Sequence, residues 1–371
     1  MREILKSSTG GTNTDLAENV LVTLSQKEPP EGYSRLVKKF PNCTFNFYAL
    51  EEWDGLWHFG IPDDSPRLSE LLRQATVLLV DWTLPNIEQV PNLKIVQLSI
   101  SGFDRVVKQP LYTDTGITFC TSNGIYSTKI AEHVFLTLLS IRNSFDQLLS
   151  QQHSRIWDDI AYPRPKDLSG TTIGILGYGS IGRQVARIAS GLGMKIHAYT
   201  ASPRPTPASR ADRGYILPGT GDRNGQLPDA WFSGTDKPSL HTFLSGVDVL
   251  VCSLPLTDLT RHMLSTAEFE ILGRRKAYVV NVSRGGIIDH DALTKALKAG
   301  LLAGASLDVT EPEPLPTDSE LWTMRDVVIT PHISGTGRGY VARVVDLLEA
   351  NLERLSAGES MFNVVKRGRG Y

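Results

Sequence analysis

The chain has 371 residues, of which 21% are charged and 41% hydrophobic, and its formal net charge is −2 at pH 7. This length exceeds what one hydrophobic core usually serves, so we expect two domains. The near-neutral charge disfavours nucleic acid or an acidic membrane surface as the main partner. No apolar run approaches the roughly 18 residues of a membrane span, and the first residues lack the apolar core of a signal peptide.

The cysteines and histidines indicate no metal site. Cys43, Cys120 and Cys252 are far apart and form no C-x-x-C pair, so we expect reduced core residues in a cytoplasmic protein. Clustered Cys/His spacing and an H-E-x-x-H motif are both missing, and no metal is expected.

The first part of the chain predicts an α/β region. Short apolar segments at 19–24, 77–80, 90–100 and 117–120 indicate strands, with helical stretches such as 69–74 between them. Apolar residues then recur at spacings of three and four over 127–149, which predicts one long helix capped by Ser127 or Thr128.

A second α/β region follows the polar stretch 151–169. Strands are expected at 172–176, 195–200, 247–254, 277–282, 303–309 and 327–330, with helices between them. This alternation predicts a parallel, doubly wound sheet. Residues 203–240 hold six prolines and five glycines, and we expect an inserted surface loop there.

Residues 177–182 read Gly-Tyr-Gly-Ser-Ile-Gly, after an apolar strand and before an amphipathic helix. In this context the spacing is the fingerprint of a dinucleotide site. Gly177 permits the tight turn, Gly179 lets the backbone approach a pyrophosphate, and Gly182 lets helix and strand pack closely.

The next strand ends at Thr200 without the Asp or Glu that usually accepts hydrogen bonds from the ribose of NAD. Ser202 and Arg204 follow, and both side chains suit a 2′-phosphate. We therefore expect NADP(H) as the preferred cofactor, with NAD(H) as the alternative.

Three further segments place an arginine, an acid and a histidine after apolar runs. They are Arg284, one of Glu311 and Glu313, and His332. An arginine grips a carboxylate bidentately. A histidine moves a proton near neutral pH, and an acid beside it orients the ring. The set suits a reaction on a small oxo acid, whereas the other seven histidines are expected to be structural.

Together these segments resemble the D-isomer-specific 2-hydroxyacid dehydrogenase family. The likeness covers roughly residues 75–350 and is carried by 177–182, 253–257, 281–286, 307–315 and 331–335. It implies an NAD(P)-dependent reductase of 2-oxo acids, such as glyoxylate or hydroxypyruvate, that yields the D-2-hydroxy acid. It also implies that Arg284 anchors substrate, that His332 donates the proton and that Glu313 is the partner of His332.

The resemblance extends to binding residues. The amides of Ile100, Ser101 and Gly102 would bind the substrate carboxylate together with Arg284, and Trp82 and Tyr126 are candidates for the pocket wall. The cofactor set that the motifs and the family together imply is Gly177, Gly179, Ser180, Ile181, Gly182, Thr200, Ser202, Arg204, Leu254, Pro255, Val282, Ser283, Asp308, His332 and Gly335.

The family's architecture implies a Rossmann domain inserted into a smaller flavodoxin-like α/β domain, with the active site in the cleft. We place the substrate domain at 1–141 and 336–371 and the NAD(P) domain at 142–335. A homodimer is expected from the long helix. Two alternatives stay open: a dinucleotide-sensing, corepressor-like scaffold, and a formate dehydrogenase, which Glu313 disfavours because relatives of that enzyme carry Gln there.

Overall fold

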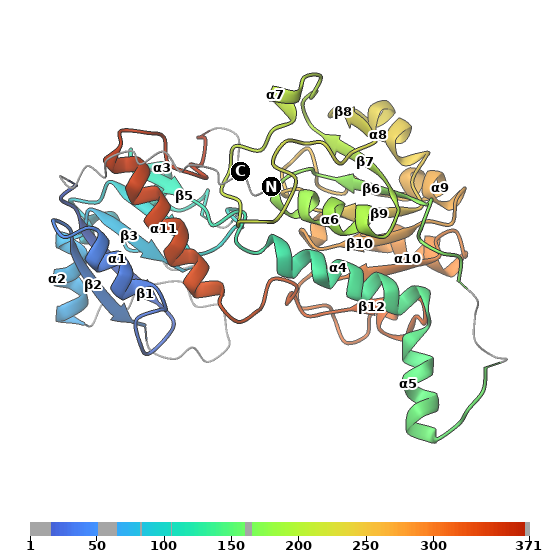
Figure 1. Ribbon diagram of the computed structural model, residues 1–371. Helices are drawn as coiled ribbons and strands as arrows, with labels where there is room; N and C mark the ends of the chain where they lie inside the picture. Colours follow the sequence, from blue (N-terminus) through green and yellow to red (C-terminus); the bar gives the residue numbers. More distant parts are fainter. Residues whose placement is uncertain (1–15, 51–64, 82–83, 105, 160–164, 368–371) are drawn as a thin grey trace, which may run out of the picture. The chain divides into compact units, whose positions relative to one another are not determined.

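The computed structural model describes residues 16–50, 65–81, 84–104, 106–159 and 165–367. The chain divides into two compact units (Figure 1): unit 1 comprises Met1–Asn123 and Gly339–Tyr371, and unit 2 comprises Gly124–Arg338. Each unit holds one parallel sheet, which confirms the expected two-domain α/β fold. Within the described residues, no helix is both long and apolar enough to cross a membrane.

Unit 1 has the strand order β2-β1-β3-β4-β5, which is the flavodoxin-like order. Its strands are β1 Asn19–Leu24, β2 Thr44–Ala49, β3 Val77–Val80, β4 Ile95–Leu98 and β5 Thr118–Cys120. Its helices are α1 Tyr33–Lys39, α2 Pro66–Gln74, α3 Pro110–Thr113 and α11 Tyr340–Ser356, with a short 3₁₀ turn, η1, at Ile87–Gln89. The sequence pattern missed α1 and β2.

Both ends of the chain build unit 1. Helix α11 is tied to α1 because Glu349 accepts from Arg35 at 2.9 Å and from Lys39 at 2.7 Å. Further along, the backbone N–H of Val365 donates to the carbonyl of Phe119 at 2.8 Å, beside strand β5. The C-terminal segment therefore completes the fold that residues before 124 begin.

Unit 2 has the strand order β12-β11-β10-β9-β6-β7-β8, the doubly wound Rossmann order with one added strand. Its strands are β6 Thr172–Leu176, β7 Lys195–Thr200, β8 Ala230–Ser233, β9 Val249–Cys252, β10 Tyr278–Asn281, β11 Gly304–Leu307 and β12 Val327–Ile329. Its helices are α4 Ser127–Arg142, α5 Phe145–Ser154, α6 Ser180–Gly191, α7 Pro207–Arg210, α8 Lys237–Leu244, α9 Thr266–Gly273 and α10 His290–Lys298, with 3₁₀ turns η2 Gly285–Ile287 and η3 Glu320–Thr323.

The single long helix expected over 127–149 is wrong, because the chain forms α4 and α5 with a break between them. Ser144 adopts a left-handed conformation with φ 44°, and the backbone N–H of Asn143 ends α4 on the carbonyl of Leu139. Small polar residues tolerate such a break better than apolar ones. The expected N-cap is also wrong: the cap position is Tyr126, and the Ser127 hydroxyl instead donates to the carbonyl of Gly124 at 3.0 Å.

Helix α4 belongs to unit 2, whereas the sequence grouped 124–141 with the other domain. Its buried residues Ile130, Val134 and Leu138 share a hydrophobic cluster with Ile173 of β6. The hydroxyl of Ser306 on β11 donates to that of Thr137 at 2.8 Å. Burial against the seven-stranded sheet therefore decides where this helix folds.

The expectation of a plain surface loop at 203–240 is also wrong. The stretch contains α7, the start of α8, and β8, which pairs in parallel with β7 and is the third strand of the Rossmann order. Prolines lie in the first turn of both helices, where a missing N–H costs nothing.

Candidate active site

The glycine-rich turn joins β6 to α6 at the point where the strand order reverses. Gly177 has φ +98°, and a Cβ there would lie 2.9 Å from the backbone of Ser253. A Cβ on Gly182 would lie 2.3 Å from the carbonyl oxygen of Gly177. Both positions exclude side chains, so the turn is as tight as the motif requires.

Gly179 differs from its two neighbours, because a Cβ there would meet nothing within 4 Å. It is the N-cap of α6 and supplies no side-chain bond to the helix amides. The first amides of α6, which include those of Ser180 and Ile181, therefore stand at an open cradle. A pyrophosphate fits this arrangement, since helix N-termini bind anions.

The end of β7 carries the residues expected near the ribose. The Thr200 hydroxyl donates to the carbonyl of Ser202 at 2.8 Å, which shapes the turn. Arg204 is exposed and donates to the carbonyl of Ser209 at 2.7 Å. Ser202 is exposed as well. Among the described residues, no carboxylate stands at this strand end between Thr200 and Ser209.

Two more strands, β9 and β10, end at the same edge of the sheet as the glycine turn. Leu254 follows β9, and its Cβ approaches within 3.0 Å of the position that a Cβ on Gly177 would take. Val282 and Ser283 follow β10 and are buried, and the Ser283 hydroxyl donates to Asn281 at 2.7 Å. Pro255 is exposed, with its carbonyl accepting from Thr260.

Arg284 begins the tight turn after β10. Its Nη1 donates to the carbonyl of Ser283 at 2.8 Å, and its own carbonyl accepts from Asn281 at 2.9 Å. A Cβ on Gly285 would lie 2.0 Å from the backbone of Thr310. Glycine is therefore required for this turn to lie against the loop after β11.

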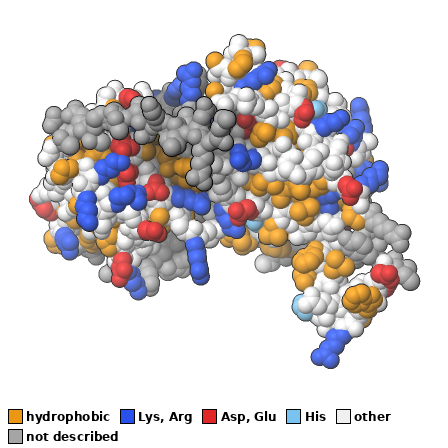
Figure 2. All heavy atoms as spheres, viewed as in Figure 1, with side chains coloured by type: hydrophobic (Ala, Val, Ile, Leu, Met, Phe, Trp, Pro, Cys, Tyr) orange, Lys and Arg blue, Asp and Glu red, His pale blue; other side chains and the backbone are white. Residues whose placement is uncertain are grey.

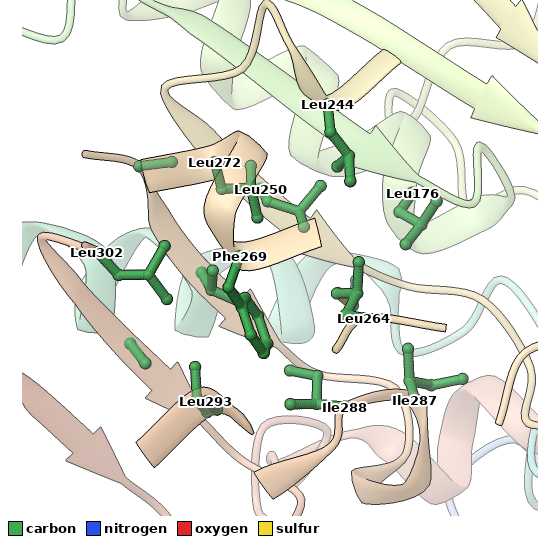
Figure 3. Close-up of a cluster of buried hydrophobic side chains, with 14 of the residues drawn as sticks. Leu176, Leu244, Leu250, Leu264, Phe269, Leu272, Ile287, Ile288, Leu293 and Leu302 are labelled. Atoms are coloured by element: carbon green, nitrogen blue, oxygen red, sulfur yellow. The ribbon is translucent and has the colours of Figure 1, made fainter. Parts of the chain in front are cut away.

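A cluster of buried hydrophobic side chains supports the turn that begins at Arg284. Ile287 and Ile288 point into a cluster with Leu264 and Phe269 (Figure 3), and all four are fully buried. Burying such side chains contributes roughly 1.5–3 kcal/mol each. The position of the Arg284 backbone therefore depends on the core and not on a flexible surface loop.

The two candidate acids occupy different places. Glu313 Oε1 lies 3.0 Å from His332 Nδ1, and each side chain is 35% exposed. Glu311 instead pairs with Arg261 and lies 2.7 Å from His262 Nε2. The hydrogen bond from His262, and to a smaller extent the one from Arg261, lowers the pKa of Glu311. Of the two acids, Glu313 is therefore the one that contacts His332.

Asp308 is buried directly after β11 and organises the loop that carries His332. Its carboxylate accepts from the Thr330 hydroxyl at 2.6 Å and from the backbone N–H groups of Ile333 at 2.9 Å and Ser334 at 3.0 Å. Its backbone carbonyl accepts from His332 at 2.8 Å. Sequence analysis missed this bracing role, because the bonded residues are more than twenty positions apart.

His133 on α4 extends the network, since its Nε2 lies 3.1 Å from the Thr330 hydroxyl. Because the Thr330 hydroxyl donates its hydrogen to Asp308, it accepts from His133, and Nε2 of His133 is the donor. Burial lowers the pKa of His133, although the Asp308 charge opposes the change. Burial therefore favours the neutral form of the ring. The spacing of α4 residues identified only its apolar face and gave no signal for this contact.

The remaining predicted residues lie elsewhere. Ile100 is buried after β4 in unit 1, and its carbonyl accepts from Ser122 at 2.8 Å. Ser101 donates to the carbonyl of Ser122 at 3.1 Å, and Gly102 follows it. Gly335 packs near Tyr126 in unit 2. Trp82 lies outside the described residues.

Comparison with known proteins identifies a family. The model of the D-isomer specific 2-hydroxyacid dehydrogenase NAD-binding domain matches residues 135–216 and 222–334. A glyoxylate reductase of Thermococcus litoralis is 28% identical, over 92% of this chain and 95% of its own. A glycerate dehydrogenase of Methylorubrum extorquens is 27% identical, over 87% and 94%.

A solved structure gives the same result. The D-isomer specific 2-hydroxyacid dehydrogenase of Xanthobacter autotrophicus, in complex with NADPH and MES, superposes with a TM-score of 0.71 at 26% identity, over 96% of this chain and all of that one. The matched segments contain the glycine turn, Arg284, Glu313 and His332. The chain therefore belongs to the D-isomer specific 2-hydroxyacid dehydrogenase family of NAD(P)-dependent oxidoreductases, and unit 2 is its nicotinamide dinucleotide-binding domain.

Proposed function

We propose that this protein reduces a small 2-oxo acid to the D-2-hydroxy acid, with NADPH as the preferred reductant. The observation that carries the proposal is the 3.0 Å contact between His332 Nδ1 and Glu313 Oε1, on loops at the carboxyl edge of the sheet that also bears the glycine turn and Arg284. Ligands bind at this edge in open α/β sheets.

The dinucleotide would be held at that edge. The amides of Gly179, Ser180 and Ile181 would bind the pyrophosphate, with Gly177 and Gly182 permitting the turn. Thr200, Ser202 and Arg204 would hold the ribose and its phosphate. The bound cofactor supplies the hydride for the carbonyl carbon. The wall residues in this proposal are Leu254, Pro255, Val282, Ser283, Asp308, His332 and Gly335.

The protein's own groups move the proton and hold the substrate. Because His332 Nδ1 faces the Glu313 carboxylate, that nitrogen carries a hydrogen and Nε2 is directed elsewhere. Protonated Nε2 would donate to the carbonyl oxygen of the substrate. Arg284 would hold the substrate carboxylate and stabilise charge that develops on the oxygen. The amides of Ile100, Ser101 and Gly102 in unit 1 are further candidates for binding a substrate carboxylate.

The substrate class follows from the chemistry and from relatives. An arginine and exposed amides select a carboxylate, and a proton donor selects a carbonyl next to it. The relatives described above are named for glyoxylate reduction and glycerate oxidation, so glyoxylate and hydroxypyruvate are the first substrates to test. Buried, reduced Cys120 and Cys252 suit the cytoplasm as the location.

We also propose a two-fold homodimer that pairs through α4 and α5. Figure 2 shows hydrophobic side chains over these helices. Leu136 is 64% exposed and Trp157, just beyond α5, is 97% exposed. Leu139, Phe145, Leu149 and Ile156 add to this apolar surface. Exposed apolar patches of this kind mark protein contacts, and two-fold dimers are the commonest assembly.

One experiment tests the function. Purified protein is assayed against a panel of 2-oxo acids with NADPH and with NADH, and His332→Ala serves as the control. We expect glyoxylate or hydroxypyruvate to be reduced with NADPH, and the variant to be slower by about 100-fold or more. Tight dinucleotide binding without turnover would instead support the corepressor-like scaffold. Oxidation of formate would support the formate dehydrogenase alternative.

A further inference from the structure

Arg183 lies inside the first turns of α6 and is buried, although it carries a charge. Its Nη1 donates to the carbonyl of Asp222 at 2.5 Å and its Nη2 to the carbonyl of Arg210 at 2.7 Å. Its Nε lies 3.5 Å from a carboxylate oxygen of Asp212. All three partners belong to residues 204–227, which we call the clamp segment.

A cation near a helix N-terminus opposes the helix dipole, and a buried charge is costly without partners. The clamp segment, and not α6 itself, therefore supplies the partners that stabilise the buried charge of Arg183. Two parts of the segment that are separated along the chain, 210–212 and residue 222, both contact this one side chain. The guanidinium thereby fastens the segment to the helix that follows the glycine turn.

Tyr178 makes the second link, and it lies within the glycine turn itself. Its hydroxyl donates to Asp222 Oδ2 at 2.8 Å. The same carboxylate accepts from the backbone N–H groups of Gln226 at 2.9 Å and Leu227 at 3.1 Å. Burial, and then the Asp222 charge, raises the pKa of Tyr178, so the phenol keeps the proton that it donates.

The next turn of α6 provides a third link. Gln184 accepts from the backbone N–H of Gly221 at 2.7 Å, and Arg187 donates to the carbonyl of Gly221 at 3.2 Å. The family match omits residues 217–221, so these contacts are made by the part of the segment that the family model lacks. Tyr178 and Trp231 of β8 also meet edge to face, with ring centroids 5.0 Å apart.

We propose that the clamp segment positions the glycine-rich turn for the dinucleotide, so that docking of the segment and binding of the cofactor favour each other. The inference rests on the proposed cofactor role of that turn. All three links end on residue 178 or on the first turns of α6, next to the amides at the Gly179 cradle. A turn that is ordered beforehand loses less entropy when the ligand binds, and linkage makes the effect reciprocal.

The test uses the full-length protein and the single bond between Tyr178 and Asp222. Tyr178→Phe, Asp222→Asn and the double variant are compared with wild type by fluorescence titration of NADPH and by limited trypsin digestion with and without NADPH. Tyr199→Phe is the matched control, because its hydroxyl donates to the carbonyl of Gly234 at 3.0 Å, outside the clamp segment.

We expect each single variant to raise the Kd for NADPH by about tenfold, the size of one hydrogen bond to a charged group, and the double variant to be no worse than either. Trypsin should cleave faster after the exposed Arg213 and Arg223 in these variants, and NADPH should slow cleavage in wild type. If the Tyr178–Asp222 bond were only structural, its loss would lower the free energy of unfolding, but NADPH would still slow trypsin cleavage as it does in wild type.

Three results would overturn the inference. In the first, Tyr178→Phe binds NADPH as tightly as wild type. In the second, the effects of the two substitutions multiply in the double variant, which would show that they act separately. In the third, NADPH leaves wild-type cleavage unchanged. If Asp222→Asn fails to fold, Tyr178→Phe decides alone. Failure of the wild-type protein to bind NADPH or NADH at all would instead reject the proposed function, and the clamp with it.

Discussion

His332 is held to Asp308 through the backbone: its N–H donates to the Asp308 carbonyl at 2.8 Å, and the Asp308 carboxylate takes the N–H of the next residue, Ile333, at 2.9 Å. His332 has φ 53°, a left-handed conformation that costs a non-glycine residue roughly 1–2 kcal/mol. The bonds to Asp308 offset that cost. The proton donor that we propose is therefore fixed by an acid that lies beneath it and not only by Glu313.

The histidine at the end of this network predicts a pH dependence of stability. Burial lowers the pKa of His133 below its ordinary value of 6.5, with Asp308 opposing this change and Lys129 adding to it. As the pH decreases through 6.5, the unfolded chain takes up the proton before the folded chain does. The free energy of unfolding therefore decreases as the pH decreases. The loss begins near pH 6.5 and ends below the folded-state pKa.

Urea unfolding at pH 7, 6 and 5 measures this effect. His133→Gln keeps a donor for Thr330 and removes the titration, so its free energy of unfolding should vary less with pH than that of wild type. His197 and His290 also have lowered pKa values, mainly because of burial, and they leave a residual slope in the variant. An identical slope in both proteins would contradict the prediction.

The two neighbouring glutamates give a matched pair of variants. Glu313→Gln should lower kcat by about 10–100-fold, because a neutral amide orients His332 but no longer stabilises its charged form. Glu311→Gln changes the same atoms two residues away, where the partners are Arg261 and His262. It should change kcat by less than about threefold. Steady-state kinetics at saturating substrate compares them, and equal losses would remove the special role of Glu313.

Arg284→Lys should be far from conservative, because a point charge cannot replace the planar guanidinium. We expect a higher KM for the oxo acid and a lower kcat, with a combined loss of about 100-fold or more. Arg261→Lys is the control, because Arg261 is a partly exposed arginine that pairs with Glu311 and has no proposed role in substrate binding. An unchanged kcat/KM in Arg284→Lys would show that Arg284 only supports its turn.

Cofactor preference is tested at the end of β7. A charge-assisted bond from Arg204 to a 2′-phosphate contributes roughly 1.5–3 kcal/mol, so Arg204→Ala should raise the KM for NADPH by about tenfold or more and barely change that for NADH. Arg213→Ala removes another exposed arginine nearby as the control. A wild-type enzyme that prefers NADH would reject the proposed preference.

The assembly prediction uses two exposed leucines of unit 2. Leu136 on α4 is 64% exposed and Leu259 is 71% exposed outside the α4 and α5 surface. Light scattering at micromolar concentration should give twice the chain mass of 40.8 kDa for wild type and for Leu259→Asp. Leu136→Asp should weaken the dimer by about tenfold or more. A wild-type monomer would end the proposal.

Sequence patterns predicted those elements in which the order of apolar and polar residues along the chain indicates which side chains are buried. Strand β7 matches its expected range of 195–200, and the motif around Gly177 lies at the expected turn. Strand β2 was missed because its residues are only partly buried and mix polar with aromatic side chains. Strand β8 was hidden by the prolines and glycines around it. Its register comes from pairing with β7, which local sequence does not encode.

The candidate site shows the same division. Arg284, Glu313 and His332 each stand after a run that predicts a strand, so their shared edge was predictable. The break at Ser144 and the network of Asp308, Thr330 and His133 were not, because both depend on side chains that meet only after the sheet has formed. Tertiary contacts override local pattern in these places.

The contact between Gly285 and the Thr310 backbone limits how this enzyme can be redesigned. No side chain fits at Gly285, since a Cβ would lie 2.0 Å from Thr310. The turn that begins at Arg284 and the loop after β11 therefore pack closely against each other at this point. Under the roles that we propose, a redesign that shifts Arg284 to enlarge the substrate pocket must also accommodate the loop that carries Glu313, so the two segments should be varied together in paired libraries and not in single-site scans.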